Sequence, residues 1–303
     1  MHILAKKNEL MKINRRRAPS SAVSQKKKID GHLNEKQVEK LIGGQVIEGS
    51  QKADLEGEIG KSSIKSGKKW QILLYSYGTI SNKKYLKILK PCLDAFTENY
   101  NDFTTDRTKC IYYKENYLKK HGKEKTKLLS NEEINKILGN NKYVDAKRSL
   151  AKATPDVSNK LKDKIYLKKF LSEAIFNLEE VSFLIIKDST YKKDNSQNIF
   201  TKEYVLETLC SEITPAISKA GNAPQDYNVP GQKTLLRYMK DNGKTKNIAE
   251  IEVRTDSEEK YRYIRFNMYS RDVLYLLLGR NNNLSSKKIA ENFIAYEDAI
   301  KCF

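Results

Sequence analysis

The chain has 303 residues, of which 39% are hydrophobic, enough for the core of one large domain or two small ones. Its 57 Lys and Arg against 38 Asp and Glu give a formal charge of +19. Such an excess favours nucleic acid as the partner, because phosphates release counterions when cationic side chains bind them. The lack of an apolar run of about 18 residues argues against a membrane-spanning helix.

The cysteines contain no CxxC pair, and the three histidines do not stand at zinc-ligand spacing from them. We therefore expect four free thiols, a cytoplasmic location and no structural zinc. No apolar stretch follows the first lysines, so we expect no secretory signal. The cysteines are Cys92, Cys110, Cys210 and Cys302.

Residues 1–30 are basic and polar, with clusters at 15–17 and 26–28, which is typical of a flexible basic arm. The arm could follow a DNA backbone or could be a solvated tail, and the sequence leaves both open. We expect residues 31–303 to form a single domain.

The next segment predicts a helix followed by a small sheet. Asn34 can cap a helix over 35–42, which Gly43 and Gly44 would end. Three strands are expected at 45–49, 53–59 and 62–66, and Gly60 and Lys61 are placed in the turn of a hairpin formed by the last two. A long helix is then predicted from about residue 69 past Leu74, with helical spacing resuming over 82–96.

The middle of the chain, about 104–158, is rich in lysine and weakly patterned, and we interpret it as an insertion or a DNA-facing subdomain. Apolar residues at helical spacing then predict a helix over 159–180. The apolar run 181–186 predicts a strand buried on both faces, and Thr201 can cap a helix reaching residue 209. Two short helices in the insertion are expected at 115–121 and 131–138.

Alternating apolar and polar residues over 248–254 and 261–268 predict an antiparallel hairpin, followed by helices at 271–278 and 285–301. The fold class is therefore α/β: a mixed central β-sheet flanked by helices, with a basic insertion and a C-terminal hairpin plus helices.

Asp54 and Lys65 carry the candidate chemistry, since a tight hairpin would bring them to the same end of the sheet. The stretch 49–71, GSQKADLEGEIGKSSIKSGKKWQ, resembles the active site of the PD-(D/E)XK nucleases, the family of most type II restriction endonucleases. That family places Asp on one strand, acid-x-Lys on the next, often a Gln beyond, and commonly a Glu on the preceding helix.

Matched residue by residue, Asp54 takes the place of the first acid, Lys65 of the lysine, Gln71 of the later Gln and Glu35 of the helix acid, with Glu39 a poorer candidate. The resemblance covers only about residues 32–77. Two positions depart from the pattern: Ala53 stands where the family has Pro, and Ser63 stands where it has the second acid. Glu58 and Glu48 are carboxylates that could compensate for that missing acid.

The resemblance implies a Mg²⁺ site formed by Asp54, Glu35 and Glu58, because magnesium prefers hard oxygen ligands. The metal would polarise the phosphate and lower the pKa of a bound water. Lys65 would stabilise the charge that develops on the phosphate, and Gln71 would orient Lys65 or the water. Taken singly, each residue also fits an ordinary surface position.

The basic side chains most suited to DNA contact are those flanking the site and those of a later basic stretch, namely Lys68, Lys69, Lys233, Arg237 and Arg262. Glu250 and Glu252 are the second candidate metal site, although their alternation with Ile251 and Val253 is typical of a solvated strand face.

The function implied is Mg²⁺-dependent cleavage of double-stranded DNA by a sequence-specific type II restriction enzyme. A homodimer is expected because a cut in both strands suits a symmetric enzyme, and no small-molecule cofactor is expected. The alternatives are a non-catalytic DNA-binding protein, such as a plasmid or phage replication or regulatory factor, which Ser63 favours, and an RNA-associated protein.

Overall fold

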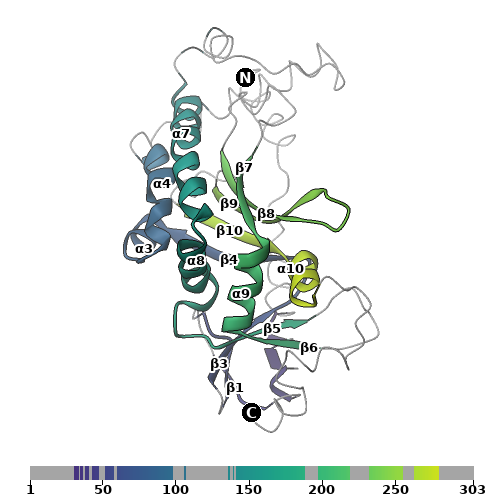
Figure 1. Ribbon diagram of the computed structural model, residues 1–303. Helices are drawn as coiled ribbons and strands as arrows, with labels where there is room; N and C mark the ends of the chain where they lie inside the picture. The colour runs from purple at the N-terminus through teal and green to yellow at the C-terminus, as the bar shows by residue number, and fades with distance from the viewer. Residues whose placement is uncertain are drawn as a thin grey trace, which may run out of the picture.

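The computed structural model contains two separate five-stranded sheets within its described residues (Figure 1). These residues are 31–33, 35–36, 38–40, 43–47, 52–57, 60–97, 106, 136, 139, 141–187, 197–218, 232–254 and 263–279. The basic arm at 1–30, the expected helices at 115–121 and 285–301, and nearly all of the expected helix at 131–138 lie outside them. The α/β class is confirmed, but two sheets replace the single central sheet that the sequence predicted.

The first sheet is mixed and has the order β1-β2-β3-β5-β6. The expected hairpin is confirmed, since β2 and β3 pair antiparallel with Leu55 opposite Ser62. Its turn differs from the prediction, because Gly60 and Lys61 belong to β3 and the chain reverses after Gly57. The strands are β1 (Gln45–Val46), β2 (Leu55–Gly57), β3 (Gly60–Lys65), β5 (Phe183–Lys187) and β6 (Gln197–Thr201).

The central strand β5 confirms the predicted buried strand. It pairs parallel with β3 on one side and antiparallel with β6 on the other. Leu184, Ile185 and Ile186 are at most 2% exposed, so both faces of the strand are covered.

The second sheet is antiparallel throughout and has the order β4-β10-β9-β8-β7. The predicted C-terminal hairpin is confirmed within it, with Ile264 of β10 opposite Val253 of β9. Its strands are β4 (Lys69–Ser76), β7 (Thr214–Ile217), β8 (Lys233–Met239), β9 (Thr245–Val253) and β10 (Tyr263–Tyr269).

Strand β4 overturns the predicted helix from residue 69. Trp70 and Ile72 are buried while Lys69 and Gln71 are exposed, which is the two-residue alternation of a strand. The spacing of Trp70 and Leu73 also fits a helix, and pairing with β10 decides the outcome. Helical structure begins only at Tyr77, after Ser76 accepts a hydrogen bond from the Thr79 amide.

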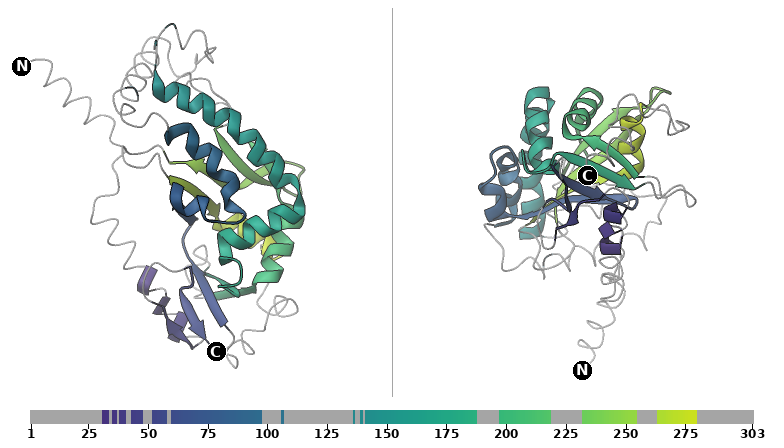
Figure 2. Two further views of the ribbon diagram at one scale, coloured as in Figure 1. Left: turned by 90° about the vertical axis from the view of Figure 1, so that its left-hand side faces the viewer. Right: turned by 90° about the horizontal axis from the view of Figure 1, so that it is seen from below.

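Helices cover one face of the second sheet and join it to the first (Figure 2). The expected helix over 159–180 is divided, because Asp163 ends α7 and caps α8 by accepting from the amides of Ile165 and Tyr166. Thr201 caps α9 as predicted, by accepting from the Tyr204 amide. The helices are α3 (Tyr77–Ser81), the 3-10 helix η1 (Leu86–Leu89), α4 (Lys90–Thr97), α7 (Lys142–Lys162), α8 (Lys164–Phe176), α9 (Lys202–Glu212) and α10 (Ser270–Leu277).

The end of the predicted insertion contributes to the main core. Tyr143, Val144, Leu150 and Val157 of α7 are buried in the same cluster as side chains of the second sheet. No described helix is both long enough and apolar enough to cross a membrane. Cys92 and Cys210 are buried free thiols, as expected, and the other two cysteines lie outside the described residues.

A smaller core forms on the face of the first sheet that points away from the main core. Residues 31–33, 35–36 and 38–40 are helical, and Val38 packs in one cluster with Ile64 and Ile185. The other face of this sheet turns toward the main core, which includes Leu184 and Ile186. The two faces therefore have different neighbours, and this decides which predicted site residues can meet.

Candidate active site

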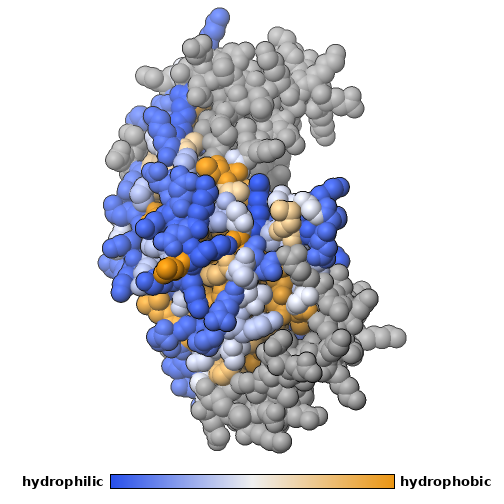
Figure 3. Space-filling view, viewed as in Figure 1, coloured by the Kyte–Doolittle hydropathy of each residue, from blue (hydrophilic) through white to orange (hydrophobic). Residues whose placement is uncertain are grey.

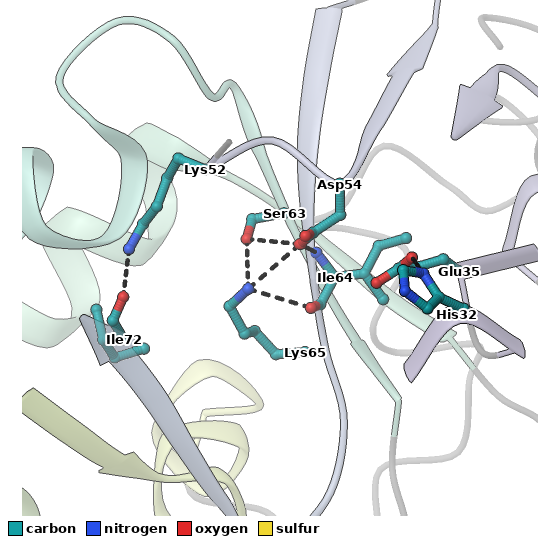
Figure 4. A network of polar contacts seen from close by, with 8 residues as sticks. All are labelled: His32, Glu35, Lys52, Asp54, Ser63, Ile64, Lys65 and Ile72. Carbon is teal, nitrogen blue, oxygen red and sulfur yellow. Dashed lines mark hydrogen bonds and ion pairs between the residues drawn. The ribbon is translucent and has the colours of Figure 1, made fainter. Parts of the chain in front are cut away.

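The β2–β3 hairpin brings Asp54 and Lys65 together, as the sequence predicted. Asp54 directly precedes β2, and its backbone amide donates to the Ser62 carbonyl at 2.8 Å. Ser63 and Lys65 are two residues apart on β3, so their side chains lie on the same face, while Ile64 points to the smaller core. The ordinary pairing of a hairpin therefore builds the group shown in Figure 4.

The Asp54 carboxylate is the centre of this group. Its Oδ2 accepts hydrogen bonds from the Ser63 hydroxyl at 3.0 Å, the Ile64 amide at 2.6 Å and the Lys65 ammonium at 3.3 Å. A carboxylate that accepts several donors is held in one orientation. Its Oδ1 has no hydrogen-bond partner among the described residues and stays available to a ligand.

Lys65 is fixed by its own strand as well as by Asp54. Its Nζ donates to the Ser63 hydroxyl oxygen at 2.6 Å and to the Ile64 carbonyl at 3.2 Å. The side chains of Lys65 and Asp54 are 18% and 23% exposed, whereas Ser63 is fully buried. Solvent and an anionic ligand can therefore reach the charged pair, and Ser63 acts as a support beneath it.

Lys52 is a neighbour of the site that the sequence did not single out. Its ammonium crosses from the first sheet to donate to the Ile72 carbonyl of β4 (Figure 4). Burial, and then the positive charge of Lys65, lower the pKa of Lys52 to about 7. No local sequence signal marks Lys52, because its contact with the Ile72 carbonyl comes from β4 of the other sheet.

The structure does not bring Glu35 to this pair. The Glu35 carboxylate bonds to His32 Nδ1 at 3.0 Å, and no hydrogen bond or ion pair of the described residues joins it to Asp54 or Lys65. Figure 4 shows Glu35 and His32 on the far side of Ile64 from Ser63 and Lys65. The helix packs through Val38 on that opposite face, which is why its acid does not converge with Asp54.

Of the three other candidate carboxylates near the hairpin, one has a different partner and two lie outside the described residues. Glu39 accepts a hydrogen bond from the Val46 amide at 3.2 Å and so secures β1. Glu58 and Glu48 lie outside the described residues.

The helical spacing after residue 69 predicted a helix at Gln71, but Gln71 lies on β4 of the second sheet, where it is exposed and stands opposite Asn267. Within the described chain it makes no hydrogen bond to Lys65. No contact among the described residues therefore supports the expected role of Gln71 in orienting Lys65.

The residues present fit magnesium only in part. Protein sites for this ion commonly supply one or two carboxylates, while water and substrate phosphates complete the shell. Asp54 offers one carboxylate oxygen, and no group of three or more His, Cys, Asp or Glu gathers anywhere in the described residues. Mg²⁺ would thus need a phosphate and water beside Asp54.

Two of the expected DNA-binding lysines are engaged within the protein. Lys69 pairs with Glu250, and Lys233 pairs with both Glu250 and Glu252. Arg265 completes the network by pairing with Glu252.

The second candidate metal site is therefore an ion-pair network and not a solvated strand face, since the side chains of Glu250 and Glu252 are only 13% and 8% exposed while those of Lys69 and Lys233 are 42% and 40% exposed. Burial raises the pKa of Glu250, but the hydrogen bond and charge of Lys69, with Lys233, bring it below its usual value. The charges of Glu252 and Glu250 outweigh burial and raise the pKa of Lys233.

The remaining expected DNA contacts vary in availability. Lys68 is exposed in the turn before β4, and Arg237 donates from Nε to the Asn247 side chain at 2.9 Å. Arg262 lies outside the described residues.

A scan against protein-family models found no match to this chain, and searches of curated proteins and of solved structures found none either.

Proposed function

We propose that this protein is a Mg²⁺-dependent endonuclease that cleaves double-stranded DNA, and that it is a sequence-specific restriction enzyme of the PD-(D/E)XK type. The observation that carries the proposal is the convergence of Asp54, Ser63 and Lys65 on one partly exposed face of a hairpin. The formal charge of +19 supports a polyanionic substrate.

In this proposal Asp54 would hold the metal through the carboxylate oxygen that accepts no hydrogen bond from the described residues, and the substrate phosphate and water would be needed to complete the site. Bound there, Mg²⁺ would supply a water of lowered pKa and would polarise the phosphate. Lys65, beside Asp54, stabilises the extra negative charge of the transition state with its ammonium. Ser63 keeps Lys65 in place through their 2.6 Å hydrogen bond, which limits the motion of that charge.

A cleavage assay tests the proposal. Purified protein is incubated with supercoiled plasmid DNA and with phage DNA, in Mg²⁺ and in EDTA. Discrete fragments with Mg²⁺ and intact DNA with EDTA support a site-specific nuclease, and sequencing the fragment ends gives the recognition sequence. Intact DNA in both buffers, with divalent ions varied, contradicts it.

A second candidate is a non-catalytic DNA-binding protein. Two observations favour it: Ser63 is bonded to Asp54 where the family has its second acid, and the described residues hold no cluster of three metal-ligating side chains. In this case Asp54 and Lys65 only stabilise the hairpin. The protein would then bind a DNA duplex with a steep salt dependence and leave it uncut in every divalent ion.

A further inference from the structure

A polar cleft of about 380 Å³ lies away from the candidate active site, between the end of the β8–β9 hairpin and α10. Figure 1 shows this hairpin projecting beyond the body of the second sheet, with α10 beneath it. The projecting end is hydrophilic on the face seen in Figure 3. A cleft of this volume is within the range of small-ligand sites and can hold a sugar-phosphate unit.

Two side-chain contacts hold the hairpin against the helix and give the cleft a fixed shape. Asp272, in the first turn of α10 and only 6% exposed, accepts from Lys246 at 2.6 Å and from the Tyr238 hydroxyl at 2.8 Å. The Tyr275 hydroxyl donates to the Asp241 carboxylate in the hairpin turn. A site built from groups already held in place loses little entropy when it binds a ligand.

The charges of the cleft are unevenly neutralised. Both lining carboxylates, Asp241 and Asp272, are engaged by the contacts above. Lys240 and Arg271 also line the cleft, and among the described residues their side chains have no ion pair or hydrogen bond. The residues that line the cleft therefore include three cations, Lys240, Lys246 and Arg271, against two carboxylates, which leaves a formal excess of one positive charge.

We propose that this cleft is a binding site for a backbone phosphate of duplex DNA, held by Lys240 and Arg271. The ammonium comes from the residue just after β8 and the guanidinium from α10, and both groups bind phosphate oxyanions, Arg through paired donors. Because both cations are available, whereas Lys69 and Lys233 are held by Glu250, the cleft is the better phosphate contact of this sheet. The inference rests on the DNA partner of the proposed function and not on cleavage.

Fluorescence anisotropy with a labelled DNA duplex in EDTA tests the site, because binding without metal does not depend on nuclease activity. The full-length protein is compared with the double variant Lys240→Ala/Arg271→Ala over about 50 to 200 mM salt. The matched control, Lys87→Ala/Lys152→Ala, removes two exposed lysines from η1 and α7, neither of which lines the cleft.

We expect the cleft variant to bind more weakly, and its slope of log K against log salt to become shallower by about 0.9 for each phosphate that it no longer binds, while the control keeps the wild-type slope. Equal slopes for wild type and cleft variant, or weaker binding only in the control, overturn the proposal. If the slope changes as expected but DNA stays intact in Mg²⁺, the cleft stands and the nuclease proposal fails. If DNA is cut in Mg²⁺ and the slope of the cleft variant is unchanged, the nuclease proposal stands and the cleft proposal fails.

Discussion

The Nζ of Lys65 lies 3.3 Å from Oδ2 of Asp54, although eleven positions separate the two residues along the chain. The antiparallel pairing of β2 with β3 produces this contact, and the buried Ser63 hydroxyl bridges the two charges from below. The pair is thus set by backbone hydrogen bonds and needs no ligand to assemble. Four consequences of this and related contacts can be measured.

Replacing Lys65 should separate catalysis from folding. We expect Lys65→Met to lower the cleavage rate by about 10²- to 10³-fold, the usual effect of losing one charge-stabilising donor. Its matched control is Lys61→Met on the same strand, where the lysine makes only a long 3.9 Å pair with exposed Glu56. Full activity in Lys65→Met, measured on plasmid DNA, would refute the role given to Lys65.

Replacing Asp54 in two ways should separate its charge from its hydrogen bonds. Asp54→Asn keeps an acceptor for the Ile64 amide, so we expect nearly wild-type unfolding in urea but no metal-dependent cleavage. Asp54→Ala removes the acceptor of three donors, and we expect the free energy of unfolding to fall by about 1–3 kcal/mol. Equal stability of Asp54→Ala and wild type would show that the hairpin does not depend on this carboxylate.

The lowered pKa of Lys52 predicts a pH-dependent stability. Between its folded pKa of about 7 and its ordinary value of 10.5, the unfolded state holds one more proton than the folded state. Stability contributed by this group therefore rises with pH across that window, by up to about 1.4 kcal/mol per pH unit. Below the folded pKa both states are protonated and the dependence ends.

The variant Lys52→Met removes this titration while keeping an unbranched side chain. We expect the difference in unfolding free energy between the variant and wild type to favour the variant most at neutral pH and below, and to shrink as pH rises. Urea unfolding at a series of pH values measures it. A difference that is constant with pH would contradict the assignment.

Glu173 of α8 should be among the most important polar side chains for stability. It is 2% exposed, and its carboxylate accepts from the backbone amides of Lys84, Tyr85 and Leu86 at 3.0, 2.6 and 2.9 Å. We expect Glu173→Ala to lower the free energy of unfolding by about 2–4 kcal/mol, because it leaves buried donors without a partner.

The control for this prediction is Glu207→Ala on α9, whose carboxylate is 70% exposed and makes only a 3.6 Å pair with Lys168. We expect this change to alter stability by about 0–1 kcal/mol. Urea unfolding of both variants decides the matter, and similar losses of stability would show that Glu173 has no special structural role.

The sequence alone predicted the secondary structure correctly where the local pattern was compatible with only one kind of element. The apolar run at 181–186 could only be buried on both faces, Thr201 had a helix to cap, and the alternation at 248–254 and 261–268 required a hairpin; all three are present. The tight hairpin after Asp54 likewise predicted that Lys65 would meet it. In the two hairpins and at the Thr201 cap, the hydrogen bonds that fix the structure come from near neighbours along the chain. For the run at 181–186 the apolar composition alone predicted burial, although its pairing partner β3 lies far away in the sequence.

Tertiary structure decided the segments whose patterns had two readings. Residues 69–76 fit a helix or a strand, and β10, far along the chain, supplied the pairing that made them β4 and placed Gln71 away from Lys65. Glu35 does not meet Asp54, because its helix packs through Val38 against the other face of the first sheet. Lys52 is covered by β4, whose Ile72 carbonyl accepts its hydrogen bond. Periodicity specifies that a residue is covered but not by what, because the covering surface comes from distant parts of the chain.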